Sequence, residues 1–270
     1  MTRFLVVPQW QGSPAPRAML LTEGAAAIAG DLPRARTTTL DVPLEAGDAQ
    51  GTAVHRLSSL RRTRSLLEEA LAGAEEPTVV IGGDCGVSVG AISALPGDLD
   101  DVAVVWCDAH PDLHSPDTSP SGAYSGMALR AVLADTTFPL PGRAGITASR
   151  LVLVGAREVD DAERRFAEEA GIIRVPTLDD PESIARAVAA TDAARVYVHL
   201  DVDVLDPSKL SGVSSPAPFG LGVSELVTAL RALRDAVPLA GATIAGFAPR
   251  TADDAVNDLG AVLRLIGAVA

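Results

Sequence analysis

The sequence feature that most constrains the fold is a regular alternation of short apolar runs with segments of helical spacing. Runs rich in Val and Ile occupy residues 4–7, 37–42, 79–81, 102–106, 151–154, 172–175, 196–200 and 243–244. Apolar residues at helical spacing lie between them, in residues 55–72, 161–170, 181–190 and 223–236. This alternation is typical of a parallel sheet with helices on both faces. We therefore expect an α/β fold with about eight mostly parallel strands.

The length and composition predict one globular domain over residues 1–270. A chain of 270 residues that is 47% hydrophobic can bury a substantial core. No apolar run approaches the length needed to cross a bilayer, so we expect no membrane partner. No basic and apolar leader follows Met1, and this predicts a cytoplasmic protein. Cys85 and Cys107 each end an apolar run beside acidic residues, and we expect both to be reduced.

The net charge is -13, and no Lys/Arg-rich stretch is interleaved with aromatic residues. Such a chain would repel a phosphate backbone, so we expect no nucleic-acid partner. No linker or repeat divides the chain. The longest irregular stretches, residues 111–125 and 207–222, are of a length that is usually functional in a compact domain.

Acidic residues and one histidine cluster where predicted strands end. Asp108, His110 and Asp112 follow residues 102–106, Asp201 and Asp203 follow residues 196–200, and Asp84 with Cys85 follows residues 79–81. Ligands of open parallel sheets bind beyond the carboxyl ends of the strands, so the three segments can form one site. In extended segments, side chains two residues apart would point the same way and present the ligands as rows.

Carboxylates this close would repel one another unless cations neutralised them. Hard oxygen donors with one or two nitrogen or sulfur donors suit a borderline divalent ion. Manganese is the first expectation, and iron, cobalt, nickel and zinc remain alternatives.

Three motifs in these segments resemble those of the arginase (ureohydrolase) family. They are Gly82-Gly83-Asp84-Cys85, Asp108-Ala109-His110-Pro111-Asp112 and Asp201-Val202-Asp203-Val204-Leu205-Asp206-Pro207, and the resemblance extends over about residues 78–249. It implies a three-layer arginase-like fold and a hydrolase that cleaves a guanidine carbon–nitrogen bond. Attack by a hydroxide bridging two manganese ions is the mechanism that the resemblance implies.

The resemblance also implies the ligand sets. One cation would be held by Cys85, Asp108, Asp112 and Asp201, and the other by His110, Asp108, Asp201 and Asp203. Asp108 and Asp201 would bridge the two ions and so hold the nucleophile. Cys85 stands where the family usually has a histidine, and a thiolate can fill that role because metal coordination deprotonates it.

By the same resemblance, His114, Ser121, Asp160 and Glu163 would bind the amino acid end of a substrate. Ser121, Asp160 and Glu163 match the family's pattern, which favours an α-amino acid over agmatine. Asp160 and Glu163 also suit the acidic first turn of a helix.

Two further positions depart from arginases. Ser125 stands where they have a proton-shuttling histidine, and Gly246 where they have a glutamate facing the guanidinium. Both losses fit a less basic and slightly larger group, such as a hydroxyguanidine, if Gly246 opens volume. Together with Cys85 they resemble family members of D-cycloserine biosynthesis, an antibiotic pathway, which convert Nω-hydroxy-L-arginine to hydroxyurea and L-ornithine.

Alternatives remain at this point. The chain could be an ordinary arginase- or agmatinase-like guanidino-hydrolase, or a catalytically silent homologue that binds a metal or an amino acid. Because the chain ends at Ala270, directly after the final helix, without the tail that some arginases use for trimer contacts, we expect a monomer. His55 and His199 are expected to be structural, although His199 lies close enough to Asp201 to support a metal ligand.

Overall fold

A single eight-stranded sheet forms the centre of the protein, in a computed structural model that describes residues 2–74 and 76–270. Its strand order is β2-β1-β3-β8-β7-β4-β5-β6, and every paired strand runs parallel to its neighbour. The strands are β1 (Arg3–Val7), β2 (Thr37–Thr39), β3 (Thr78–Gly82), β4 (Val102–Cys107), β5 (Leu151–Val154), β6 (Ile173–Val175), β7 (Arg195–Asp201) and β8 (Leu239–Ala245). The expected α/β class is confirmed.

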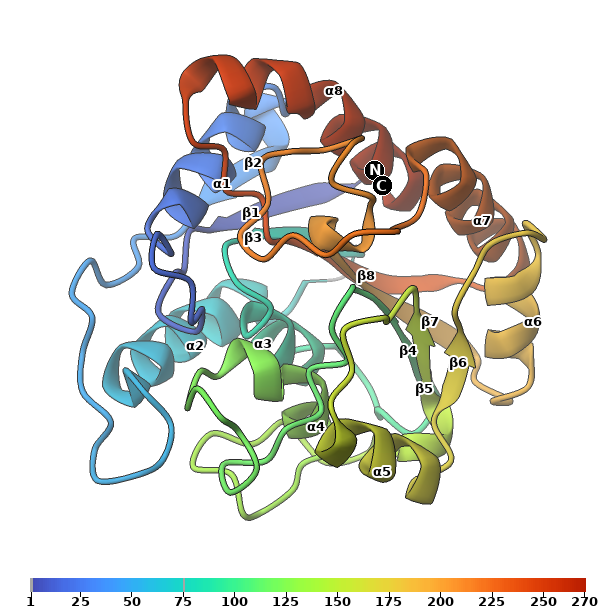
Figure 1. Ribbon diagram of the computed structural model, residues 1–270, viewed down its shortest axis with the longest axis horizontal. Helices are drawn as coiled ribbons and strands as arrows, with labels where there is room; N and C mark the ends of the chain where they lie inside the picture. Colours follow the sequence, from blue (N-terminus) through green and yellow to red (C-terminus); the bar gives the residue numbers. More distant parts are fainter. Residues whose placement is uncertain (1, 75) are drawn as a thin grey trace.

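Helices cover both faces of the sheet and make the fold three-layered (Figure 1). One face carries α1 (Leu20–Gly30), α6 (Ser183–Ala189), α7 (Val223–Ala236) and α8 (Ala252–Val269). The other carries α2 (Leu57–Leu71), α3 (Val87–Ser93), α4 (Ala128–Val132) and α5 (Asp161–Glu169). No helix among the described residues is long and apolar enough to cross a membrane.

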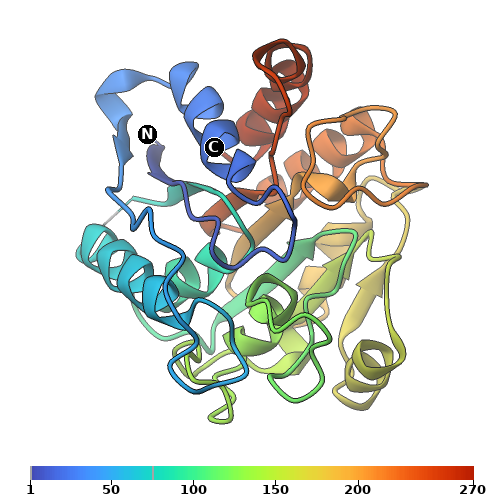
Figure 2. The same ribbon diagram turned by 60° about the vertical axis from the view of Figure 1, so that its left-hand side comes forward.

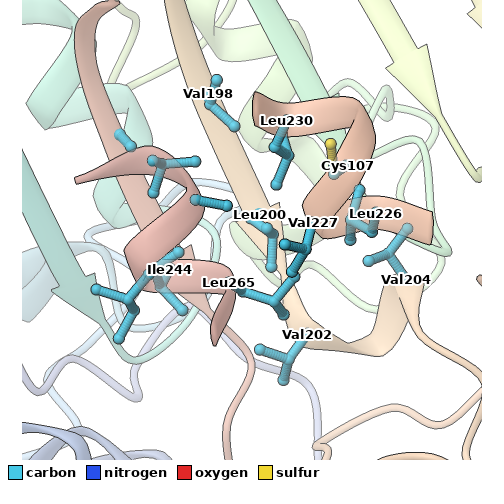
Figure 3. Close-up of a cluster of buried hydrophobic side chains, with 14 of the residues drawn as sticks. Cys107, Val198, Leu200, Val202, Val204, Leu226, Val227, Leu230, Ile244 and Leu265 are labelled. Atoms are coloured by element: carbon cyan, nitrogen blue, oxygen red, sulfur yellow. The ribbon is translucent and has the colours of Figure 1, made fainter. Parts of the chain in front are cut away.

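Strand β4 shows why the sheet is apolar on both sides. Successive side chains alternate between faces, so Val105 and Cys107 pack with α7 and α8, whereas Val104 and Trp106 pack with the helices opposite. Figure 3 shows Cys107 among the side chains of the α7 and α8 face. Both cysteines are buried and free, as expected.

The predicted strand positions are confirmed, with changed ends. The run at residues 243–244 belongs to the longer β8, whose small residues Ala240 and Gly241 concealed its start. Helices α1, α3 and α4 were not predicted, and α1 and α3 are rich in the small residues Ala, Gly and Ser, which blur the hydrophobic periodicity that marks a helix.

Long loops follow the carboxyl ends of β1, β4 and β7. Figure 2 shows them, coloured dark blue, green and orange, on the viewer's side of the sheet. The two irregular stretches expected at residues 111–125 and 207–222 are among them. The sheet therefore places its acidic strand ends beneath a common set of loops.

Candidate metal centre and substrate pocket

A cavity of about 180 Å³ lies at the carboxyl ends of β3, β4 and β7. Nearly all of the residues predicted to form the site line it, and Asp160 borders it through His114. The lining residues are Ser13, Pro14, Asp84, Cys85, Asp108, His110, Asp112, His114, Ser121, Ser125, Gly126, Glu163, Asp201, Asp203, Ser214 and Ser215.

The first group of possible ligands surrounds the Cys85 thiol. Its Sγ lies 3.2 Å from Asp201 Oδ2 and 3.8 Å from Asp108 Oδ2. One donor atom each from Cys85, Asp108, Asp112 and His199 lies within 4.8 Å of the others, and all four side chains are buried. This group could hold a cation.

The second group shares Asp108 with the first. His110 Nδ1 lies 3.4 Å from Asp108 Oδ1 and 3.1 Å from Asp203 Oδ2. Asp203 is held by the backbone, because its Oδ1 accepts a hydrogen bond from Ala109 N at 3.0 Å. Two adjoining groups that share one carboxylate are the arrangement that a binuclear centre needs.

The local backbone that aims these ligands differs from the extended rows predicted from the sequence. Asp112 has a φ of +52°, and Val202–Val204 form a short 3-10 helix that Asp201 caps by accepting a hydrogen bond from Asp203 N. The prediction that extended segments present the ligands in rows was therefore wrong, although the ligand side chains do converge on one site. Turns after the strands, rather than the pleat, direct them, because the chain must bend away where the sheet ends.

Electrostatics favours a cation here. Burial, together with the charge of Asp108, raises the pKa of Asp112 and of Asp203 well above the usual range. Burial and the surrounding carboxylates likewise raise the pKa of the Cys85 thiol. Asp112 Oδ2 and His199 Nε2 are buried without a hydrogen-bond partner among the described residues. Groups that resist ionisation and lack partners fit a site completed by divalent ions.

The predicted substrate residues meet at the start of α5. Asp160 caps this helix in a capping box with Glu163, so the expected acidic helix start is confirmed. His114 Nε2 lies 3.2 Å from Asp160 Oδ2 and 3.8 Å from Glu163 Oε2. Glu163 is buried and accepts a hydrogen bond from Leu113 N, whereas Ser121 and Asp160 are exposed. These side chains form a polar rim beside the acidic floor.

Several residues that line the cavity were not predicted from the sequence. Ser13 and Pro14 come from the loop after β1, which Asp84 holds by accepting hydrogen bonds from Gln9 Nε2 and Gly12 N. No strand-end motif marks that loop. His199, which was expected to be structural or to support a metal ligand beside Asp201, does not line the cavity but belongs to the first ligand group.

The two departures from arginases have different surroundings. Ser125 is buried and lines the cavity. Gly246 has a φ of +81°, and a Cβ there would lie 2.5 Å from Asp201 Cγ. The expectation that Gly246 opens volume is therefore wrong, because the Asp201 carboxylate already fills the space where a side chain would begin.

Comparison with known proteins agrees with the fold and the motifs. The model of the Arginase family matches residues 15–266. An arginase of Bacillus caldovelox is 32% identical in an alignment 219 residues long that covers 73% of this chain and 72% of that protein. The N(omega)-hydroxy-L-arginine amidinohydrolase of Streptomyces lavendulae is 27% identical over 266 residues, covering 95% of this chain and 93% of that protein.

Among solved structures, arginase from Bacillus subtilis superposes with a TM-score of 0.80 at 24% identity, covering 99% of this chain and 98% of that chain. Fold and topology therefore agree over almost the whole length. Family match, motifs and acidic strand ends lead to one conclusion: the chain belongs to the arginase family and is a hydrolase.

Proposed function

We propose that the protein hydrolyses the guanidine carbon–nitrogen bond of Nω-hydroxy-L-arginine, giving hydroxyurea and L-ornithine with the uptake of one water. The observation that carries the proposal is the pair of adjoining ligand groups around Asp108 on the floor of a cavity whose rim suits an amino acid. The similarity over 95% of the chain to an amidinohydrolase named for this substrate supports the choice of substrate.

The proposed centre takes two manganese ions, which would be held by Cys85, Asp108, His110, Asp112, Asp201 and Asp203. The mixture of carboxylate, imidazole and thiolate donors fits borderline divalent ions. When bound, such ions lower the pKa of water enough to supply hydroxide near neutral pH. Asp108 supports both ions in this proposal, since it contacts both Cys85 and His110.

The chain's own residues would orient the substrate. The carboxylates of Asp160 and Glu163 would attract the α-ammonium group, while Ser121 and His114 would donate hydrogen bonds to the α-carboxylate. This places the hydroxyguanidine end toward the acidic floor. Ser125 lines the cavity, where a small hydroxyl leaves room for the substrate's hydroxyl and can bond with it.

The decisive assay compares ornithine release from Nω-hydroxy-L-arginine and from L-arginine, with manganese supplied to the same preparation. We expect turnover of the hydroxylated substrate and little turnover of arginine. Ser125 replaces the proton-shuttling histidine of arginases, and proton transfer of this kind typically contributes on the order of a hundredfold or more to the rate. Equal turnover would instead identify an ordinary arginase. No ornithine from either substrate would support a silent homologue.

Metal analysis tests the bridging role. Asp108→Ala and Asp201→Ala should each lose both metal ions, while Asp160→Ala, at the rim, should retain them and weaken substrate binding. An Asp201→Ala protein with two ions and full activity would refute the bridging assignment.

A further inference from the structure

His199 is the buried group near the centre to which the proposed function gives no role. It lies on β7 with no exposed surface. Its ring stacks on Trp106, with centroids 3.6 Å apart and planes inclined by 20°. Its Nδ1 lies 2.7 Å from Ser88 Oγ on α3. The ring is therefore fixed both in position and in orientation.

The other ring nitrogen faces the ligand group. Nε2 has no hydrogen-bond partner among the residues that the structure describes, and Asp108 Oδ2 lies 3.6 Å away, beyond hydrogen-bond length. If Ser88 donated to Nδ1, then Nε2 would carry a buried proton with no acceptor, which is unfavourable. Donation from Nδ1–H to Ser88 Oγ instead leaves the lone pair of Nε2 free and directed at the cluster.

We propose that His199 is an additional metal ligand, binding through Nε2 the divalent cation held at the Cys85 end of the centre. One ring nitrogen of His199 belongs to the same compact group of donor atoms as Cys85, Asp108 and Asp112, and Nε2 is the nitrogen that lies 3.6 Å from Asp108 Oδ2. A metal-bound histidine typically donates its other ring N–H to a fixed partner, which is the part that Ser88 plays here. The inference rests on the proposed metal centre.

With this assignment, the cation beside Cys85 has an imidazole ligand as well as the thiolate. A centre with sulfur at this position would otherwise have His110 as its one imidazole ligand, on the side of Asp203. His199 restores an imidazole to the Cys85 side from β7, which β8 separates from β3 in the sheet. The cation there would then have nitrogen, oxygen and sulfur donors, a set that suits cobalt, iron or zinc as well as manganese.

The first test uses the unaltered protein loaded with two equivalents of cobalt(II). X-ray absorption at the cobalt edge counts imidazole ligands from their multiple-scattering pattern. We expect two imidazoles per two cobalt ions, from His199 and His110, together with one sulfur. A count of one imidazole would overturn the inference. If the protein bound no cobalt and no manganese, the proposed metal centre itself would fail.

The second test measures cobalt affinity in variants. His199→Gln should weaken binding of one of the two ions by more than about a hundredfold, above the roughly 10–100-fold that loss of an outer partner causes. Ser88→Ala should have such an outer effect, and His55→Gln, an exposed histidine outside the cluster, should have none.

The readouts separate the two proposals. Two ions bound with unchanged affinity in His199→Gln would overturn the assignment of His199 and leave the proposed function standing.

Discussion

Replacing Gly246 tests whether the close approach of its backbone to Asp201 dictates glycine. A non-glycine residue in left-handed backbone costs about 1–2 kcal/mol, and forcing a group into a filled site costs about 1–3 kcal/mol. With a φ of +81° and a Cβ that would lie 2.5 Å from Asp201 Cγ, Gly246→Ala incurs both costs. We therefore expect a loss of about 2–5 kcal/mol in the free energy of unfolding.

Such a loss is large beside the roughly 5–15 kcal/mol that stabilises a typical domain. It should lower Tm by roughly 5–15 °C, as measured by calorimetry on the metal-free protein. Metal analysis should also show weaker binding, because relief of the overlap moves the Asp201 carboxylate. The matched control is Gly260→Ala in α8. Apart from the nearby backbone of its own helix, a Cβ there meets no atom of the described residues within 4 Å, so the substitution should stabilise the helix by about 0.5–1 kcal/mol.

Gly246→Glu extends the test to specificity. It should not create an arginase, because the new side chain would displace Asp201 before its carboxylate could reach a guanidinium. A Gly246→Glu protein with unchanged Tm, two bound ions and a gain in arginine hydrolysis would refute this reasoning.

Three other perturbations follow from contacts around the site. Asp84→Ala leaves the buried donors of Gln9, Gly12 and Gly86 without their acceptor, and at about 1–3 kcal/mol each this should lower the free energy of unfolding in urea by roughly 3–9 kcal/mol; an unchanged midpoint would contradict it. Arg157 donates hydrogen bonds to backbone carbonyls of residues 203–205 and 217–218 and so ties the loop of residues 207–222 to the end of β7. Lysine lacks the planar fork of donors, so Arg157→Lys should speed amide hydrogen exchange in residues 207–222. Unchanged exchange would show that Arg157 does not hold this loop. In the metal-free protein, burial raises the pKa of Asp112, Asp201 and Asp203, so these carboxyls bind more protons in the folded state than in the unfolded state. Their contribution to stability is fully present below the pKa that they have in the unfolded state, and it is lost as pH rises through their pKa in the folded state. The Tm of the metal-free protein should therefore fall from pH 5 to pH 8, and a rise in Tm would contradict this prediction.

The fold was predictable because each strand carries a local signal. Val102–Cys107 is apolar at every position, as expected of a strand that is covered on both faces, and Asp108 follows the end of this strand directly. The same reasoning failed for the start of β8, where small residues give no pattern. Helix α3 was also not predicted; its Gly90 lies close against Leu67 of α2, where a larger side chain would not fit.

The site was predictable in its membership but not in its geometry. Asp108, Asp112, Asp201 and Asp203 could be named from their places after strands, whereas the positive φ of Asp112 and the 3-10 turn after Asp201 could not. These conformations depend on tertiary hydrogen bonds, such as the one from Ala109 N to Asp203, between segments far apart in the chain.

The sequence by itself determined the parallel α/β class and the acidic strand ends, because hydrophobic periodicity and motif spacing are local properties. Only the tertiary structure decided that a ring nitrogen of His199 joins the ligand group of Cys85, that the loop of Ser13 closes one side of the cavity, and that Asp201 fills the space beside Gly246. Each of these depends on which strands become neighbours and how their ends turn. Packing over the whole sheet settles that, and no single segment encodes it.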